Sequence, residues 1–77
     1  MRRLGKILHV SKSRSLIARL EKEQYLKLGT KIFDSKLKQI GVVQDLFGPV
    51  RAPYISIRPT VAEPEKYPGR VAYSLEL

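Results

Sequence analysis

The sequence predicts an all-β fold, a small closed β-barrel of six strands formed by residues 1–77 as a single domain. Six short runs of apolar or alternating residues are separated by turn residues, and none has the length and periodicity of a stable helix. A chain of 77 residues has a thin core and buries only about 60% of its unfolded surface. Closing the sheet then removes the exposed edges that an open sheet of six strands would leave.

The strands are expected at residues 4–10, 16–20, 31–34, 39–46, 54–58 and 71–77. The first two form a hairpin, because the polar and basic run 11–15 between them is typical of an exposed turn. Leu16, Ala18 and Leu20 recur at every second residue and therefore share one face of the second strand.

The segment from residue 21 to residue 28 is interpreted as a loop. It has some helical character, but Gly29 ends it, and eight residues are marginal for a helix on its own. The short third strand ends at Asp34, where a turn is expected because Asp and Ser side chains hydrogen-bond the backbone of tight turns.

The fifth strand shows the clearest alternation. Ile55 and Ile57 lie on one face and Tyr54, Ser56 and Arg58 on the other, and the following proline stops the strand. A loop over residues 60–69 contains two further prolines. In the sixth strand Val71, Tyr73, Leu75 and Leu77 alternate with Ala72, Ser74 and Glu76.

The connection between the fourth and fifth strands has the most specified chemistry of the chain. Gly48-Pro49 and Ala52-Pro53 lack two backbone N–H groups and bias the residues before the prolines towards extended geometry. Its apolar members are too many for a solvated turn; they are Leu46, Phe47, Val50 and Tyr54. We therefore expect another molecule to cover this loop.

Composition excludes several classes of site. The chain has no cysteine and no cluster of His and carboxylates with ligand spacing, so we expect no disulfide, no metal and no cofactor. No apolar run approaches the roughly 20 residues that span a bilayer, and residues 4–10 are interpreted as a strand rather than a signal sequence. A soluble, intracellular protein is expected.

The sequence also gives no support for enzyme activity. The one histidine, His9, stands between Leu8 and Val10 on an expected strand, which is typical of a surface or half-buried residue. Asp45 has no second carboxylate, Ser/His pair or glycine-rich phosphate loop beside it, so a turn-stabilising or salt-bridging role suffices.

The net charge of +8 lies entirely in the first half of the chain. Residues 1–38 hold eleven basic and three acidic residues, whereas residues 39–77 hold four of each. Such a field favours RNA, an acidic protein face or simply solubility. The aromatic residues are scattered rather than paired as a base-stacking platform. The basic residues expected near RNA are Arg2, Arg3, Lys6, Lys12 and Arg14.

With these motifs the chain resembles the small barrel subunit of archaeal and eukaryotic H/ACA ribonucleoproteins. The resemblance covers roughly residues 3–59. In chain order, it is carried by Leu4-Gly5-Lys6-Ile7-Leu8-His9-Val10-Ser11, Gly29 with Ile32-Phe33-Asp34, Ile40-Gly41, Val43, Asp45-Leu46-Phe47-Gly48-Pro49-Val50 and Pro53-Tyr54.

The sequence departs from that family at two points. Val42 stands where the family often has a charged residue, and no Arg-Gly-Gly run is present, so we expect a member without the tails of the eukaryotic ones. The resemblance therefore implies an archaeal-type member with a bare barrel of the translation-protein type. A related assembly factor shares the barrel but is usually part of a longer chain.

The resemblance implies a non-catalytic subunit that docks directly on the pseudouridine synthase of the particle and promotes substrate RNA loading and product release. Guide RNA and the other core proteins are implied as indirect partners, in the archaeal cytoplasm or a eukaryotic nucleolus. The residues expected to carry or shape the synthase-facing surface are Ile40, Gly41, Val43, Phe47, Gly48, Pro49, Val50, Pro53 and Tyr54. Barrel core or turn geometry is the alternative role of each, above all of Ile40 and Val43.

Two other functions stay open. A free-standing RNA-binding barrel of the cold-shock or oligonucleotide-binding type fits the basic first half. It would place aromatic residues among the basic strands, whereas here the exposed apolar candidates lie in the neutral second half. A translation-factor-like barrel detached from a larger protein shares the fold but leaves the loop prolines without a purpose.

Overall fold

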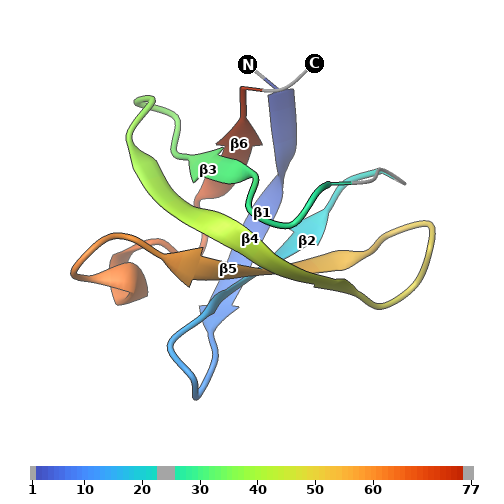
Figure 1. Ribbon diagram of the computed structural model, residues 1–77, viewed down its shortest axis with the longest axis horizontal. Helices are drawn as coiled ribbons and strands as arrows, with labels where there is room; N and C mark the ends of the chain where they lie inside the picture. The colour runs from blue at the N-terminus through green and yellow to red at the C-terminus, as the bar shows by residue number, and fades with distance from the viewer. Residues whose placement is uncertain (1, 23–25, 76–77) are drawn as a thin grey trace.

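The computed structural model describes residues 2–22 and 26–75 and has the expected architecture, a closed antiparallel barrel of six strands (Figure 1). The strands are β1 (Arg2–Val10), β2 (Leu16–Leu20), β3 (Lys31–Phe33), β4 (Gln39–Phe47), β5 (Tyr54–Pro59) and β6 (Val71–Ser74). They are hydrogen-bonded around the barrel in the order β1-β2-β5-β4-β3-β6, and β6 returns to β1. Both edges of the sheet are therefore paired with each other.

The expected strands are confirmed, with small differences at their ends. β1 begins two residues earlier than predicted, and β5 includes Pro59, which pairs with Gly41 of β4. β6 ends at Ser74. Residues 76 and 77 of the predicted last strand, and residues 23–25 of the predicted loop, lie outside the described residues.

The loop between β5 and β6 contains one turn of 3-10 helix that the sequence did not predict, η1 (Pro64–Lys66). The carbonyl of Pro64 accepts the N–H of Tyr67 at 3.1 Å. This turn brings the Tyr67 side chain into the core, where it is 7% exposed. Two backbone hydrogen bonds join the following residues to Ile7 of β1, so the loop covers the barrel rather than extending into solvent.

The core consists of apolar side chains from all six strands and the two flanking loops: Leu4, Ile7, Leu16, Ala18, Leu20, Leu26, Ile32, Ile40, Val43, Ile55, Ile57, Tyr67 and Ala72. The alternation predicted for β2 is confirmed. In β6 the larger apolar residues, Val71 and Tyr73, lie on the outside, and the interior positions are taken by the small residues Ala72 and Ser74. The inward positions of this strand are thus filled by small side chains.

The turn between β3 and β4 confirms the role predicted for Asp34. Its Oδ1 accepts the N–H groups of Lys36 and Lys38, both at 2.9 Å. Asp34 is 5% exposed, and its carboxylate supplies the acceptor that these two N–H groups would otherwise lack in the turn. Leu37 lies in the same turn with a positive φ of 66° and a side chain that is 59% exposed.

Two glycines occupy positions where neighbouring backbones approach closely. A Cβ at Gly5 would overlap the carbonyl of Arg19 on β2, and a Cβ at Gly41 would lie 2.5 Å from the carbonyl oxygen of Arg58 on β5. The pairing of β1 shifts register beside Gly5. Glycine allows β1 and β4 to bend sharply enough to pair on both sides.

Replacing Gly5 with alanine is expected to lower the free energy of unfolding by more than about 3 kcal/mol, because the clash is with backbone that cannot rotate away. Urea unfolding followed by circular dichroism measures this. Gly29→Ala is the control: nothing lies within 4 Å of its Cβ, and its positive φ costs about 1 to 2 kcal/mol. Equal losses in the two variants would contradict the close-approach explanation.

Candidate functional site

The strand ends that flank the β4–β5 loop present an aromatic pair, of which Phe47 is exposed and Tyr54 is half-buried. Phe47 and Tyr54 are cross-strand partners at the ends of β4 and β5, and their rings stack with centroids 5.7 Å apart and an interplanar angle of 26°. Phe47 is 44% exposed, and Val50 in the loop is 73% exposed. We call the side chains of Phe47, Val50 and Tyr54, with Gly48 and Pro49, the β4–β5 surface.

Backbone geometry holds this surface in place. Gly48 has φ of +91°, and a Cβ there would lie 2.8 Å from Cδ2 of the Tyr54 ring. The ring therefore packs over the glycine. At the other end of the loop, Pro53 is buried and its carbonyl accepts the N–H of Leu20 at 2.9 Å, which extends the pairing of β5 with β2. The loop is attached to the barrel at both ends.

The structure sorts the predicted synthase-facing residues into two groups. Ile40 and Val43 are core residues, 0% and 1% exposed, so their side chains occupy the barrel core, the alternative that was left open for them. Gly41 and Pro53 are also buried. These four residues shape the hairpin. The accessible groups lie on the β4–β5 surface, because β4 twists out of the barrel after its bulge at residues 43–45.

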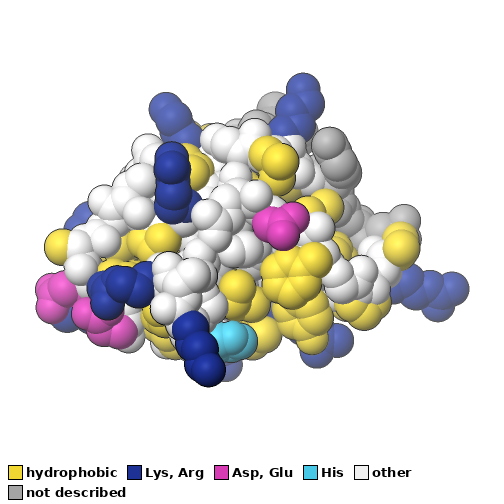
Figure 2. Space-filling model, turned by 60° about the horizontal axis from the view of Figure 1, so that its bottom comes forward, with side chains coloured by type: hydrophobic (Ala, Val, Ile, Leu, Met, Phe, Trp, Pro, Cys, Tyr) yellow, Lys and Arg dark blue, Asp and Glu magenta, His cyan; other side chains and the backbone are white. Residues whose placement is uncertain are grey.

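The β4–β5 surface continues across the outside of the barrel. Register pairs place Lys6, Arg19, Tyr54 and Phe47 in one row over β1, β2, β5 and β4. Figure 2 shows hydrophobic side chains gathered in the lower middle of one face, beside the histidine, with an acidic side chain directly above them and Lys and Arg side chains further out. Arg19 was missed as a candidate, although the alternation of the second strand already placed it outward.

The predicted basic residues do not form one surface. Arg2 and Arg3 lie at the start of β1, and Lys12 and Arg14 in the turn beyond its other end. The strand between these two groups is about 26 Å long from Arg2 to Val10, at 3.3 Å per residue. Arg3 is paired with Glu21, the residue after β2, at 3.0 Å.

The basic positions therefore divide into separate sites. Lys6 belongs with the β4–β5 surface, since it shares the row described above. Arg14 lies beside a groove next to the β1–β2 turn.

The described residues form neither a metal-binding cluster nor a membrane-spanning helix. Within residues 2–22 and 26–75, no three His, Asp or Glu side chains are close enough together to hold a metal ion. No helix formed by the described residues has the length and apolar character that crossing a membrane requires.

Comparison with known proteins gives a family and two relatives. A family model described as the Gar1/Naf1 RNA binding region matches residues 1–74. An uncharacterized protein of Methanothermobacter thermautotrophicus is 49% identical over 76 residues, covering 97% of this chain and 80% of that protein. An uncharacterized protein of Methanocaldococcus jannaschii is 47% identical over 53 residues, covering 69% of this chain and 62% of that protein.

Gly48→Ala is expected to displace the Tyr54 ring and weaken its stacking on Phe47, because the added methyl group occupies the space under the ring. The measurement is the chemical shifts of the ring protons by NMR. Gly69→Ala is the matched control, with φ of +93° and nothing within 4 Å of its Cβ. Both variants lose about 1 to 2 kcal/mol from the left-handed backbone, but only Gly48→Ala should move the ring resonances. Unchanged resonances would show that Gly48 does not position Tyr54.

Proposed function

This chain belongs to the family of the Gar1/Naf1 RNA binding region, and from that premise we propose that it is a non-catalytic subunit of an H/ACA ribonucleoprotein. In this role it docks on the catalytic domain of the pseudouridine synthase. Guide RNA selects the target uridine and the synthase isomerises it, while this subunit promotes loading of substrate RNA and release of product.

The stacked pair of exposed Phe47 and half-buried Tyr54 is the observation that supports docking through the β4–β5 surface. Aromatic residues are frequent anchors of protein interfaces, and such residues carry much of the binding energy when a partner desolvates them. Phe47, Tyr54 and Val50 together offer an apolar centre. Lys6 and Arg19 continue the row and provide a basic border, which favours a partner with apolar residues flanked by acidic ones.

The rigidity of the loop supports the same role. Gly48 fixes the path of the chain under the Tyr54 ring, and buried Pro53 is hydrogen-bonded to β2. Because the loop is already ordered before binding, little conformational entropy is lost when a partner covers it. The surface is therefore suited to act on a mobile element of the synthase without itself rearranging.

Phe47→Ala is expected to weaken binding to the pseudouridine synthase of an archaeal H/ACA particle by roughly thirtyfold, about 2 kcal/mol. The measurement is capture of the synthase by the immobilised chain in about 0.5 M salt, with and without guide RNA, since salt screens electrostatic contacts through RNA. Capture by the unaltered chain should resist salt and need no RNA.

The control is Leu28→Ala, which truncates a side chain that is 67% exposed and lies outside the β4–β5 surface. It should capture the synthase normally. If a folded Phe47→Ala variant keeps full affinity, the anchor role is wrong. If the unaltered chain binds RNA alone, and loses it in salt, the free-standing RNA-binding barrel is the better function.

A further inference from the structure

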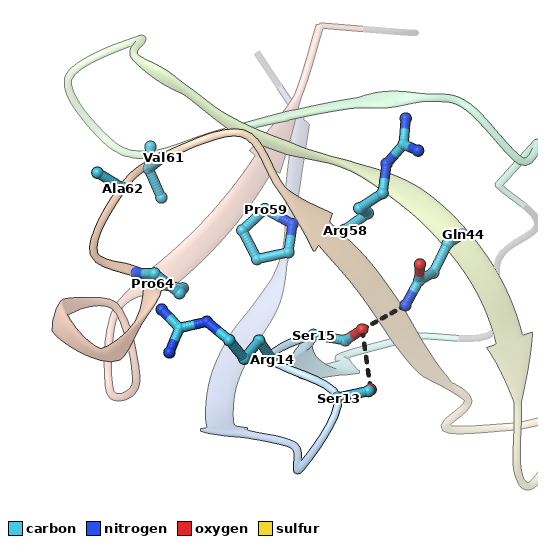
Figure 3. Close-up of a pocket in the computed structure, with 9 residues that line it drawn as sticks. All are labelled: Ser13, Arg14, Ser15, Gln44, Arg58, Pro59, Val61, Ala62 and Pro64. Atoms are coloured by element: carbon cyan, nitrogen blue, oxygen red, sulfur yellow. Dashed lines mark hydrogen bonds between the residues drawn. The ribbon is translucent and has the colours of Figure 1, made fainter.

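A groove of about 450 Å³ lies between the β1–β2 turn and the segment that follows β5 (Figure 3). Its basic groups are Arg14 from the turn and Arg58 from β5, and its polar groups include Ser13 and Gln44. Its apolar wall includes Pro59 and Pro64. We call it the β1–β2 groove. It is distinct from the β4–β5 surface, because Tyr54 and Arg58 are four residues apart on β5, about 13 Å at 3.3 Å per residue.

The groove carries positive charge that internal pairing does not cancel. No acidic side chain is among the described residues that line it. Arg14 approaches Glu65 at 3.5 Å, but both side chains are more than half exposed, and such surface pairs contribute little. No ion pair within the described residues includes Arg58. Two guanidinium groups therefore remain available to an anionic ligand.

The turn that carries Arg14 is held in one conformation. Ser11 and Ser15 are joined by a backbone hydrogen bond of 2.8 Å, and the N–H of Arg14 donates to the carbonyl of Ser11 at 2.9 Å. The N–H of Ser15 also donates to Oγ of Ser11 at 3.2 Å. Arg14 itself adopts φ of +66°. The starting point of its side chain is thus fixed before any ligand arrives.

A polar network fixes one wall of the groove. Gln44 stands at the β4 bulge, and its Nε2 donates to Oγ of Ser56 at 2.8 Å and to Oγ of Ser15. Ser15 is 5% exposed and Ser56 is 9% exposed, so the amide covers two buried hydroxyls. Figure 3 shows the amide oxygen of Gln44 pointing away from Ser13 and Ser15. That oxygen is left to accept a hydrogen bond from a ligand hydroxyl.

The groove also has an apolar wall, formed by Pro59, Val61 and Pro64. Val61 packs against the core and Pro64 is buried, so packing on the core holds this apolar wall in place. A free inorganic anion gains nothing from it. A strand of RNA offers charged phosphates to the arginines and apolar area to this wall, because its phosphates alternate with riboses and bases. Each ribose also carries a hydroxyl.

We propose that the β1–β2 groove binds the ribose-phosphate backbone of single-stranded RNA directly. Arg14 and Arg58 contact phosphates, and the amide oxygen of Gln44 accepts a ribose 2′-hydroxyl. This assignment deepens the proposed function and rests on it only for the class of ligand, which is RNA. A subunit docked through the β4–β5 surface would then keep a second face free for an RNA strand.

The test measures binding of a fluorescein-labelled decauridylate to the full chain by anisotropy between about 0.05 and 0.4 M salt. The variant is Arg14→Asn/Arg58→Gln, because asparagine tolerates the positive φ at residue 14. Each phosphate contact contributes about 0.7 to the slope of log affinity against log salt. The slope should fall by about 1.4, and affinity at 0.1 M salt by at least about tenfold.

The matched control is Lys27→Gln/Lys31→Gln, which also removes two positive charges from exposed positions outside the groove. It should lose less than about threefold in affinity. Equal losses in both double variants would mean that net charge alone attracts RNA and would overturn the proposal. So would failure of the unaltered chain to bind at 0.05 M salt, or displacement of the RNA by decaglutamate as effectively as by unlabelled decauridylate.

Two further measurements separate this proposal from its premise. Decadeoxyuridylate should bind several-fold more weakly than the RNA, and equal affinity would remove the ribose contact assigned to Gln44. Arg14→Asn/Arg58→Gln should still capture the synthase, whereas Phe47→Ala should still bind decauridylate. If every variant binds RNA as expected but the unaltered chain captures no synthase, the docking function is wrong and the groove assignment stands.

Discussion

Closure of the barrel depends on two places where backbones approach more closely than a side chain permits. β1 pairs with both β2 and β6, and β4 pairs with both β3 and β5. Each of these long strands bends at a glycine, Gly5 or Gly41, whose missing Cβ leaves room for a neighbouring carbonyl. Without these bends the sheet would keep two unpaired edges, and a chain of this size has too thin a core to tolerate them.

The closed strand order places β5 between β2 and β4, and both candidate surfaces depend on that strand. Ile55 and Ile57 anchor it in the core. Tyr54 at its first residue belongs to the β4–β5 surface, and Arg58 near its end lines the β1–β2 groove. Because one rigid strand positions both, their separation is set by the strand itself and not by a flexible linker. On the two proposals made above, the strand would hold the protein partner and the RNA in a defined relation.

Strand positions and the inward face of β2 were predictable because alternation reports which side of a strand is apolar. Ser56 shows the limit of that reasoning: its position on β5 is outward as predicted, yet it is buried because Gln44 from the adjacent strand lies over it. Ile40 and Val43 belong to a motif that resembles an interface, but they stabilise the barrel from within. The separation of the basic residues into different sites could not be predicted either. It follows from the pairing register of the strands, because the distribution of charge along a sequence does not show which residues lie side by side.

The junction between β3 and β6 has a consequence for how the barrel moves. Among the described residues these strands meet through a single register pair, Phe33 with Tyr73, whereas β4 and β5 are paired along most of their length. Local opening begins where the fewest backbone hydrogen bonds must break. The barrel therefore has a preferred line of fraying between β3 and β6, and it can fluctuate there while the pairing of β2, β5 and β4 stays intact.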